Sequence, residues 1–324
     1  MHFNGRLHRT LLSLPVLGVL IFTILPLVFM ISMAFTNYDR DHQVPGKLFT
    51  WIGLDNFRTV LDFNGAFGQT FWPILGWTFT WAIFATFLNY ILGMLLAILI
   101  NKKEVRWKGF WRFCFILSIA VPQFVSLLIM SKMLDTGGGI LGSGGGIITQ
   151  LIERIFDYHL KFGIDINTTR ICIVIVNMWI GVPYSMLMCS GILMNIPNDL
   201  YESARIDGAS PARRFFKITL PYMLFVTGPY LLTSFVGNLN NFNVIYLLTQ
   251  NNQLINTEIG TAGGVSVTYT DLLITWLYKM TLNSAESKYY LASIIGILVF
   301  VVVAILSLIV YNVIPSTKNE EDYS

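Results

Sequence analysis

The stretch YESARIDGASPARRFFKITLP, residues 201–221, decides how the chain is organised, because it is a long polar segment between two long apolar ones. Apolar residues dominate 171–195 before it and 218–248 after it. Each apolar segment reaches the roughly 20 residues that a helix needs to cross the hydrocarbon core of a bilayer. The stretch is therefore predicted to join two membrane spans.

Four further apolar segments, residues 11–33, 71–100, 110–134 and 291–314, have the same character. Over all 324 residues, 54% are hydrophobic and 12% charged, whereas a soluble domain carries about a quarter charged residues. Strict alternation typical of barrel strands is absent, and helices satisfy their own backbone groups in lipid. We predict an all-α, polytopic membrane protein with about six transmembrane helices.

Three regions follow from this pattern. Residues 1–69 are predicted to hold the first transmembrane helix and an external loop, residues 70–314 a membrane core with a polar loop at 198–221, and residues 315–324 a cytoplasmic tail. The triplet Ser32-Met33-Ala34 faintly resembles a signal-peptidase site. However, the apolar stretch before it exceeds the 7–15 residues of a signal peptide, so we expect an anchor that is retained.

Positive charge is distributed unevenly between the two sets of loops. About twelve Lys or Arg lie in the 54 residues of 1–10, 101–112, 196–217 and 315–324, against about seven in the alternate loops, which are twice as long. Cytoplasmic segments carry this excess, so both termini are predicted to be cytoplasmic. The dense patch from Lys102 to Arg112 needs no ligand to explain it. The net charge of +3 gives no reason to expect a nucleic-acid partner.

Several kinds of site are not indicated by the sequence. The three cysteines lie in apolar runs and the four histidines are scattered, so no metal site is expected. The glycine-rich stretch from Gly137 to Gly146 lacks the lysine of a phosphate-binding loop. Any ATP that the protein uses is therefore expected to be hydrolysed by another chain.

The polar stretch itself predicts two short helices joined by a turn. Asn198 or Asp199 can cap the first helix, which would put Glu202 in its first turn, and Gly208 permits a sharp bend. Ser210 and Pro211 suit the cap and first position of the second helix. Such a knob fits the cleft of a partner protein. The alternative is an ordinary loop whose charges only obey the positive-inside rule.

Polar residues at membrane depth form two patterns. Asn177, Gly181 and Tyr184 are spaced as one face of a helix, and Ser234, Asn238 and Asn241 repeat that spacing in the next span. Neutral amides and hydroxyls beside aromatic and glycine surface suit a sugar. The alternative is hydrogen bonding between packed helices, to which we also assign Asn89.

The motifs of the polar stretch resemble the EAA loop of binding-protein-dependent ABC permeases: E-S-A at 202–204, D-G-A at 207–209 and I-T-L-P at 218–221. Ser203 replaces the central Ala of that motif. The resemblance implies a type I importer permease in a bacterial plasma membrane, with no enzymatic activity of its own. Its implied partners are a second permease subunit, a dimer of ATP-binding subunits holding ATP and Mg, an external binding protein and membrane lipid. The residues implied to couple to the ATPase are Glu202, Ser203, Ala204, Asp207 and Gly208.

Segments 53–57, 177–184, 240–249 and 270–279 are similar to those of maltose and maltodextrin permeases. This resemblance implies an oligosaccharide substrate, maltodextrin or another oligosaccharide or sugar derivative. Three positions depart from the group, where Ile119 replaces Tyr, Gln123 replaces Ser and Gly237 replaces Phe. By the resemblance, the sugar site is lined by Asn177, Ile180, Gly181, Tyr184, Ser234, Asn238 and Asn241.

Two other classes of membrane protein have features that this sequence lacks. A secondary sugar transporter would show an inverted repeat or a buried ionisable residue, and neither is visible in the sequence. A membrane-embedded enzyme would need an acid–base pair, a metal cluster or an activated nucleophile. The sequence favours the ABC permease over both.

Overall fold

The structure is a computed structural model that describes residues 5–102, 104–136, 145–249, 258–283 and 287–313. The glycine-rich stretch at 137–144 and the predicted tail at 315–324 lie outside the described residues. The chain forms two compact units. The first comprises residues 1–72, 260–267 and 276–301, and the second comprises residues 73–259, 268–275 and 302–324.

The first unit begins with a long apolar helix made of α1 (Gly5–Val19), a π-helical turn (Leu20–Ile24) and α2 (Leu25–Ala34). After a short 3-10 turn (Arg40–Gln43) come α3 (Asp55–Leu61) and the start of α4 (Ala66–Ile83). Asn56 ties α3 to the end of α2, because its buried amide donates to the backbone oxygens of Ala34 at 3.0 Å and Thr36 at 2.8 Å. The unit also holds most of a hairpin of β1 (Glu258–Ala262) and β2 (Val265–Thr268), which adds a two-stranded sheet to the predicted helical fold. It ends with a π-helical turn (Lys279–Asn283) and α15 (Tyr289–Val313), which continues past residue 301.

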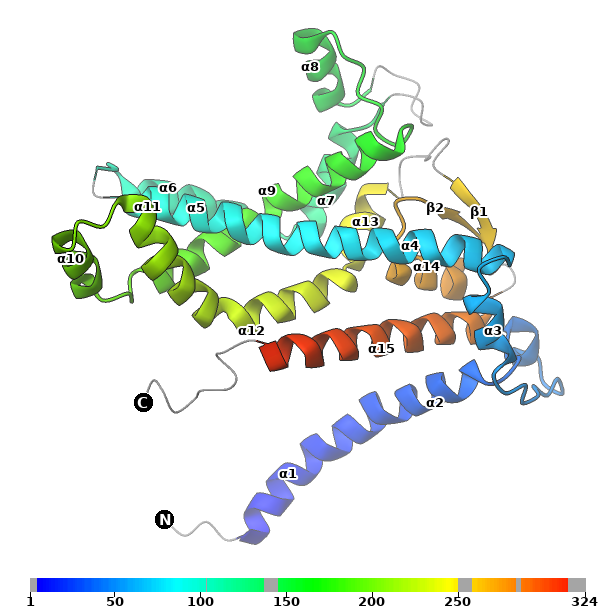
Figure 1. The fold of residues 1–324 in the computed structure, drawn as a ribbon. Coiled ribbons are helices and arrows are strands. Elements are labelled where there is room, and N and C mark those ends of the chain that lie inside the picture. The colour runs from blue at the N-terminus through cyan, green and yellow to red at the C-terminus, as the bar shows by residue number, and fades with distance from the viewer. Residues whose placement is uncertain (1–4, 103, 137–144, 250–257, 284–286, 314–324) are drawn as a thin grey trace. The chain divides into compact units, whose positions relative to one another are not determined.

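The second unit contains most of the remaining helices (Figure 1). A π-helical turn (Phe84–Leu88) joins α4 to α5 (Asn89–Asn101), so that residues 67–101 form one long apolar helix. Then follow α6 (Lys108–Ala120), α7 (Gln123–Met133), α8 (Ile147–Phe156) and α9 (Ile166–Leu193). The polar stretch forms α10 (Asn198–Ile206) and α11 (Pro211–Arg214). A π-helical turn (Phe215–Thr219), α12 (Leu220–Leu239), α13 (Phe242–Thr249) and the start of α14 (Leu273–Tyr278) complete the unit.

Among the described residues, five helices are long and apolar enough to cross a membrane, and there is a sixth span if α6 and α7 together count as one. These two helices meet at an angle of 87°, so the prediction of one regular helix over 110–134 was wrong. The break falls at Val121-Pro122. Proline disfavours the helical conformation at the residue before it and offers no N–H for the helix ladder.

The fifth predicted span is also interrupted. Residues 211–249 form one apolar segment, but α12 ends at Leu239 and α13 begins at Phe242. Asn240 and Asn241 form the break, because their amide side chains compete with the backbone for hydrogen bonds. The other four spans agree with the prediction to within a few residues at each end.

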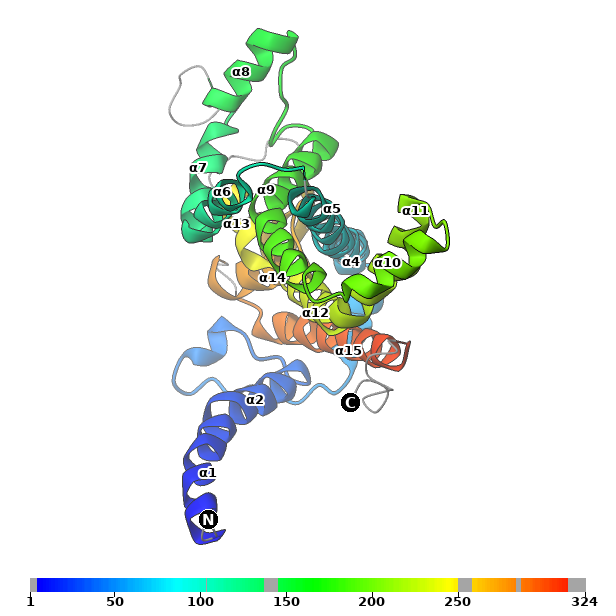
Figure 2. The same ribbon diagram turned by 90° about the vertical axis from the view of Figure 1, so that its left-hand side faces the viewer.

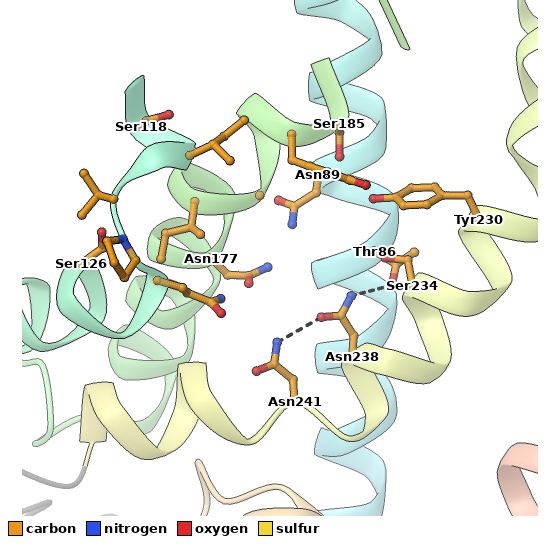
Figure 3. Close-up of a pocket in the computed structure, with 17 residues that line it drawn as sticks. Thr86, Asn89, Ser118, Ser126, Asn177, Ser185, Tyr230, Ser234, Asn238 and Asn241 are labelled. Carbon is orange, nitrogen blue, oxygen red and sulfur yellow. Dashed lines mark hydrogen bonds between the residues drawn. The ribbon is translucent and has the colours of Figure 1, made fainter. Parts of the chain in front are cut away.

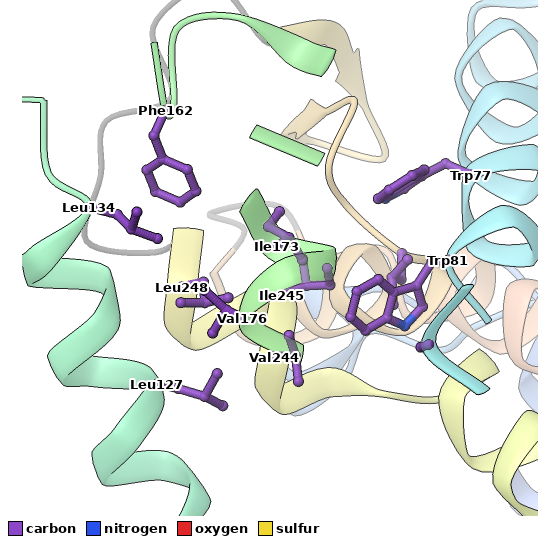
Figure 4. Close-up of a cluster of buried hydrophobic side chains, with 12 residues drawn as sticks. Trp77, Trp81, Leu127, Leu134, Phe162, Ile173, Val176, Val244, Ile245 and Leu248 are labelled. Atoms are coloured by element: carbon purple, nitrogen blue, oxygen red, sulfur yellow. The ribbon is translucent and has the colours of Figure 1, made fainter. Parts of the chain in front are cut away.

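A buried cluster of hydrophobic side chains holds α4, α7, α9 and α13 together in the second unit (Figure 4). Trp81, Ile173 and Ile245 are fully buried in it. Trp77 connects this core to Thr270, which follows strand β2. The indole N–H of Trp77 donates to the backbone oxygen of Thr270 at 3.1 Å. Ile180 of α9 packs against this cluster and also lines a polar cavity, so the cluster supports one wall of that cavity.

Helices α5 and α9 pack extensively against each other in this unit (Figure 2). Gly93 permits it. A Cβ at this position would stand 2.5 Å from the Cβ of Ser185 and 2.8 Å from the backbone nitrogen of Met186. Because backbone atoms cannot move aside cheaply, the two helices would have to separate.

We therefore expect Gly93→Ala to destabilise the folded chain by about 1–3 kcal/mol, the usual cost of overpacking. Thermal unfolding of the detergent-purified protein would measure the change. Gly76→Ala is the matched control, because the added Cβ on α4 meets no atom within 4 Å. Equal melting temperatures for the two variants would contradict the close approach.

Candidate functional site

A cavity of about 360 Å³ opens among α5, α6, α7, α9 and α12 in the second unit (Figure 3). Side chains from these five helices, from the π-helical turn at Phe84–Leu88 and from the breaks at Val121-Pro122 and Asn240-Asn241 converge on it. None of its lining residues is charged, and amide or hydroxyl groups predominate. It is lined by Thr86, Asn89, Ser118, Ile119, Val121, Pro122, Gln123, Ser126, Asn177, Ile180, Gly181, Tyr184, Ser185, Tyr230, Ser234, Asn238 and Asn241.

The predicted face of α9 does turn toward this cavity. Asn177, Gly181 and Tyr184 lie on one side of the helix, and Ile180 beside them also lines the space. Asn177 is 5% exposed, and its Nδ2 has no hydrogen-bond partner among the described residues. A buried donor without a partner costs free energy, so this amide is suited to receive a ligand acceptor.

The second polar stripe reaches the cavity in a different way from the one predicted. Ser234 and Asn238 lie on α12, but Asn241 lies in the break after this helix, so the three do not share one helical face. Asn238 Nδ2 donates to Thr86 Oγ1 at 3.0 Å, and Asn241 Nδ2 donates to Asn238 Oδ1 at 3.2 Å. Asn241 Oδ1 also accepts from the backbone N–H of Val244 at 3.2 Å, at the start of α13. The amide chain thus both holds the break in place and presents polar atoms to the cavity.

Sequence reasoning missed several residues that line the cavity, although Ser185 and Tyr230 continue the four-residue spacing of the predicted faces on α9 and α12 and could have been found by it. Thr86, Ser185 and Tyr230 are among them. The ring of Tyr230 lies 6.2 Å from that of Tyr184, so two aromatic rings border the cavity. Asn89, which we assigned to helix packing, has an Oδ1 atom without a partner among the described residues and faces the cavity.

Two of the three positions at which the sequence departs from the maltodextrin group also line the cavity. Ile119 lies at the end of α6, and Gln123 is the first residue of α7. Both flank the break at Val121-Pro122. Gly237 on α12 is not among the lining residues. The break therefore places the departures at Ile119 and Gln123 directly in the site.

At the other end of α9, the polar stretch forms the predicted pair of short helices. Gly208 has a φ of 74°, in the left-handed region where glycine is favoured, and it ends α10. The N–H of Ala209 donates to Ala204 O at 2.8 Å, and that of Gly208 donates to Arg205 O at 3.1 Å, which is the Schellman arrangement. Ser210 caps α11 by accepting from the N–H of Arg213 at 3.3 Å.

Some details of this loop differ from the prediction. Neither Asn198 nor Asp199 is the N-cap, because the helix begins at Asn198 after Pro197, and no side chain caps it. Glu202 therefore lies in the second turn of the helix, one or two positions further along than predicted, and Asp199 is the acidic residue of the first turn.

One face of α10 packs on the protein and the other is open. Tyr201 holds the inner face, since its hydroxyl lies 2.8 Å from Thr219 Oγ1. Glu202, Ser203, Asp207 and Gly208 are exposed, and Ala204 is half-buried. Ile206 is 87% exposed beside Glu202, although isoleucine is usually buried. Sequence reasoning did not single out this residue.

The part of the chain that the structure describes contains no group of three or more His, Cys, Asp or Glu residues able to hold a metal ion. Cys114, Cys172 and Cys189 are all free.

Comparison with known proteins gives a consistent result. Residues 89–319 match the family model described as "Binding-protein-dependent transport system inner membrane component". The galactooligosaccharides transport system permease protein GanP of Bacillus subtilis is 37% identical over 98% of this chain and 73% of its own length. The maltodextrin transport system permease protein MdxF of the same organism is 34% identical over 96% and 70%.

A solved structure of similar fold comes from a bacterial ABC transporter involved in the import of the acidic polysaccharide alginate. Its TM-score is 0.72 at 22% identity, and the match covers 97% of this chain and 96% of that chain. At this identity the likeness shows the fold alone, which is that of an ABC transporter permease.

Proposed function

We propose a transport function for this chain, which belongs to the family of binding-protein-dependent transport system inner membrane components. It imports a neutral oligosaccharide as one permease subunit of an ATP-driven transporter. The family makes it a transport subunit and not an enzyme. The observation that carries the sugar assignment is the cavity, where uncharged amides, hydroxyls and two tyrosine rings converge.

Sugar recognition follows from this chemistry. Hydroxyl groups need donors and acceptors, and the apolar faces of sugar rings pack on aromatic side chains. Asn177 Nδ2 and Asn89 Oδ1 offer one unused donor and one unused acceptor. An acidic saccharide would require a cation, which this lining does not supply. Relatives named for maltodextrin and galactooligosaccharide transport support the neutral oligosaccharide class.

The open face of α10 is the proposed docking surface for the ATPase. Glu202, Ser203, Ala204, Asp207 and Gly208 form the coupling segment, and Ile206 adds an apolar anchor that a partner's cleft would cover. The separate ATP-binding subunits, present as a dimer, hold ATP and Mg, and a second permease subunit completes the pathway. An external binding protein delivers the sugar. Both termini and α10 lie on the cytoplasmic side, as the distribution of Lys and Arg predicts.

The double variant Tyr184→Ala with Asn238→Ala tests the sugar site. We expect a change in sugar selectivity, because the variant removes one ring and one amide from the cavity lining while the coupling loop stays intact. Binding-protein-dependent ATPase stimulation in proteoliposomes, measured across maltodextrins and galactooligosaccharides, would report the change.

Asn240→Ala is the matched control, since Asn240 is exposed, does not line the cavity, and donates its amide to Val236 O in the last turn of α12. Unchanged selectivity together with a lowered melting temperature in the double variant would show that the amides hold helices together and do not bind the sugar.

A further inference from the structure

A second cavity of about 360 Å³ lies between α7, α8 and α9, in the unit that also holds the sugar site. Its lining is almost entirely aliphatic. Ile148 and Ile152 of α8 face Ile171, Cys172 and Ile175 of α9 across it. The hydroxyl groups on its walls are those of Tyr158 and Thr168, and the latter already donates to Asp165 Oδ2 at 2.8 Å. This cavity therefore has a different ligand chemistry from the first, which is lined mainly by amides and hydroxyls.

Helix α8 is amphipathic, with one apolar and one polar face. With about 3.6 residues per turn, its apolar side chains fall on one half of the helix and its polar side chains on the other. Within the apolar half, Ile148 and Ile152 line the cavity, while Ile147, Leu151 and Ile155 are 54–69% exposed. The polar half consists of Thr149, Gln150, Glu153 and Arg154. The exposed apolar surface therefore continues directly from the cavity wall.

The position of the cavity along α9 fixes its depth in a bilayer. This helix has 28 residues, about 42 Å, whereas the hydrocarbon core is about 30 Å thick. A centred helix therefore extends beyond the core by roughly four residues at each end. Ile171 and Ile175, exposed by 59% and 56%, then lie just inside the hydrocarbon.

The residue before α9 agrees with this placement. Asp165 caps the helix, and the backbone N–H of Thr168 donates to its Oδ2 at 2.8 Å. This hydrogen bond holds the pKa of the Asp165 carboxyl below its usual value, so the group is charged and belongs in water. The cavity thus opens between the aqueous end of α9 and the hydrocarbon, at the headgroup boundary.

We propose that this cavity binds an acyl chain of a membrane phospholipid, with α8 lying along the headgroup boundary of the leaflet opposite the α10 loop. A helix with one apolar and one charged half is stable where two phases meet, and both halves are satisfied there. Complete burial of α8 in a partner subunit would place Glu153 and Arg154 in a protein core, and a soluble partner cannot reach hydrocarbon depth. A partner subunit that covers the apolar half alone is the competing arrangement, which the crosslinking experiment distinguishes. The proposal rests on membrane insertion alone and is independent of the sugar site.

Photo-crosslinking tests the proposal. The full chain, purified with the subunits it assembles with, is reconstituted in vesicles of phosphatidylethanolamine and phosphatidylglycerol that contain a trace of phosphatidylcholine carrying a mid-chain diazirine. After irradiation, mass spectrometry compares adducts on cavity residues of α7 and α9 with adducts on the exposed helix at residues 11–34. Ile152→Trp fills the cavity, and we expect it to lower the cavity adducts about threefold while the reference adducts stay unchanged.

Glu153→Trp is the matched control, because it adds the same side chain to the polar half of α8 and should leave the cavity adducts at the original level. Ile148→Trp is a second filling variant in case the first does not insert, which the reference adducts at residues 11–34 would reveal. Absent cavity adducts in the unaltered assembly would show that a protein covers this surface and would overturn the proposal. Equal loss in the filling and control variants would overturn it too.

Discussion

Gly208→Val is expected to abolish sugar uptake, by at least about tenfold, while the chain still inserts in the membrane. A non-glycine residue pays about 1–2 kcal/mol in the left-handed conformation, and a β-branched residue fits it worst. The turn would therefore open, and the hydrogen bonds from Gly208 and Ala209 to the end of α10 would be lost. Without them α10 cannot keep its exposed face, with Glu202 and Ile206, in one orientation.

The measurement combines uptake, binding-protein-stimulated ATP hydrolysis and the amount of the chain in the membrane. Both activities should fall together, because the proposed coupling surface is lost. Gly191→Val is the matched control, since a Cβ at this position on α9 meets no atom within 4 Å and its backbone is not left-handed. Full uptake by the Gly208 variant would refute a coupling role for this turn.

Glu202→Lys tests the exposed face of α10 itself. It reverses the charge on the proposed docking surface, so we expect it to abolish both activities as well.

Gly181→Leu is expected to block sugar uptake to a similar degree but to leave ATP hydrolysis responsive to the binding protein. The added side chain would enter the cavity, and even its Cβ would overlap the amide of Asn89. The cavity holds only about 360 Å³, so a leucine displaces sugar atoms that the site must accommodate. The proposed coupling loop is unchanged. A loss of transport with retained hydrolysis therefore separates a defect in the pathway from one in coupling.

A double variant makes this result specific. Asn89→Ala removes the amide that Gly181 contacts, so Gly181→Ala combined with Asn89→Ala should regain part of the uptake that Gly181→Ala alone loses. Such non-additivity is expected for residues in direct contact. If the two losses simply add, the two residues do not share a site. Gly191→Leu again serves as the control on the same helix.

The sequence predicted the number and approximate limits of the spans, because the length of an apolar segment is a local property and it must match the thickness of the hydrocarbon core. It also located the two-helix loop, since Gly208, Ser210 and Pro211 each favour one backbone conformation by their own covalent structure. All seven residues predicted to bind sugar line one cavity. On α9, residue spacing alone was enough to place Asn177, Gly181 and Tyr184 on one face, because the helix is continuous from Ile166 to Leu193.

Periodicity failed where a helix breaks. It gave one straight span over 110–134 and one helical face for Ser234, Asn238 and Asn241, whereas the chain bends at Val121-Pro122 and again at Asn240-Asn241. The length of an apolar run does not reveal such breaks. In a membrane, irregular backbone is stable only where other protein groups satisfy its hydrogen bonds, and those groups come from elsewhere in the fold. Asn241 does this for Val244 through a contact that depends on the finished fold.

The polar stretch from Tyr201 to Pro221 and the apolar runs around it thus determine, by themselves, a helical membrane protein with an exposed two-helix loop. Tertiary structure alone decided which polar side chains meet, because Thr86, Asn89, Asn177 and Asn238 come from three helices, and no spacing within one helix relates them. The same holds for the aliphatic cavity beside α8. Local physics sets the elements, and the packing of distant elements sets the sites.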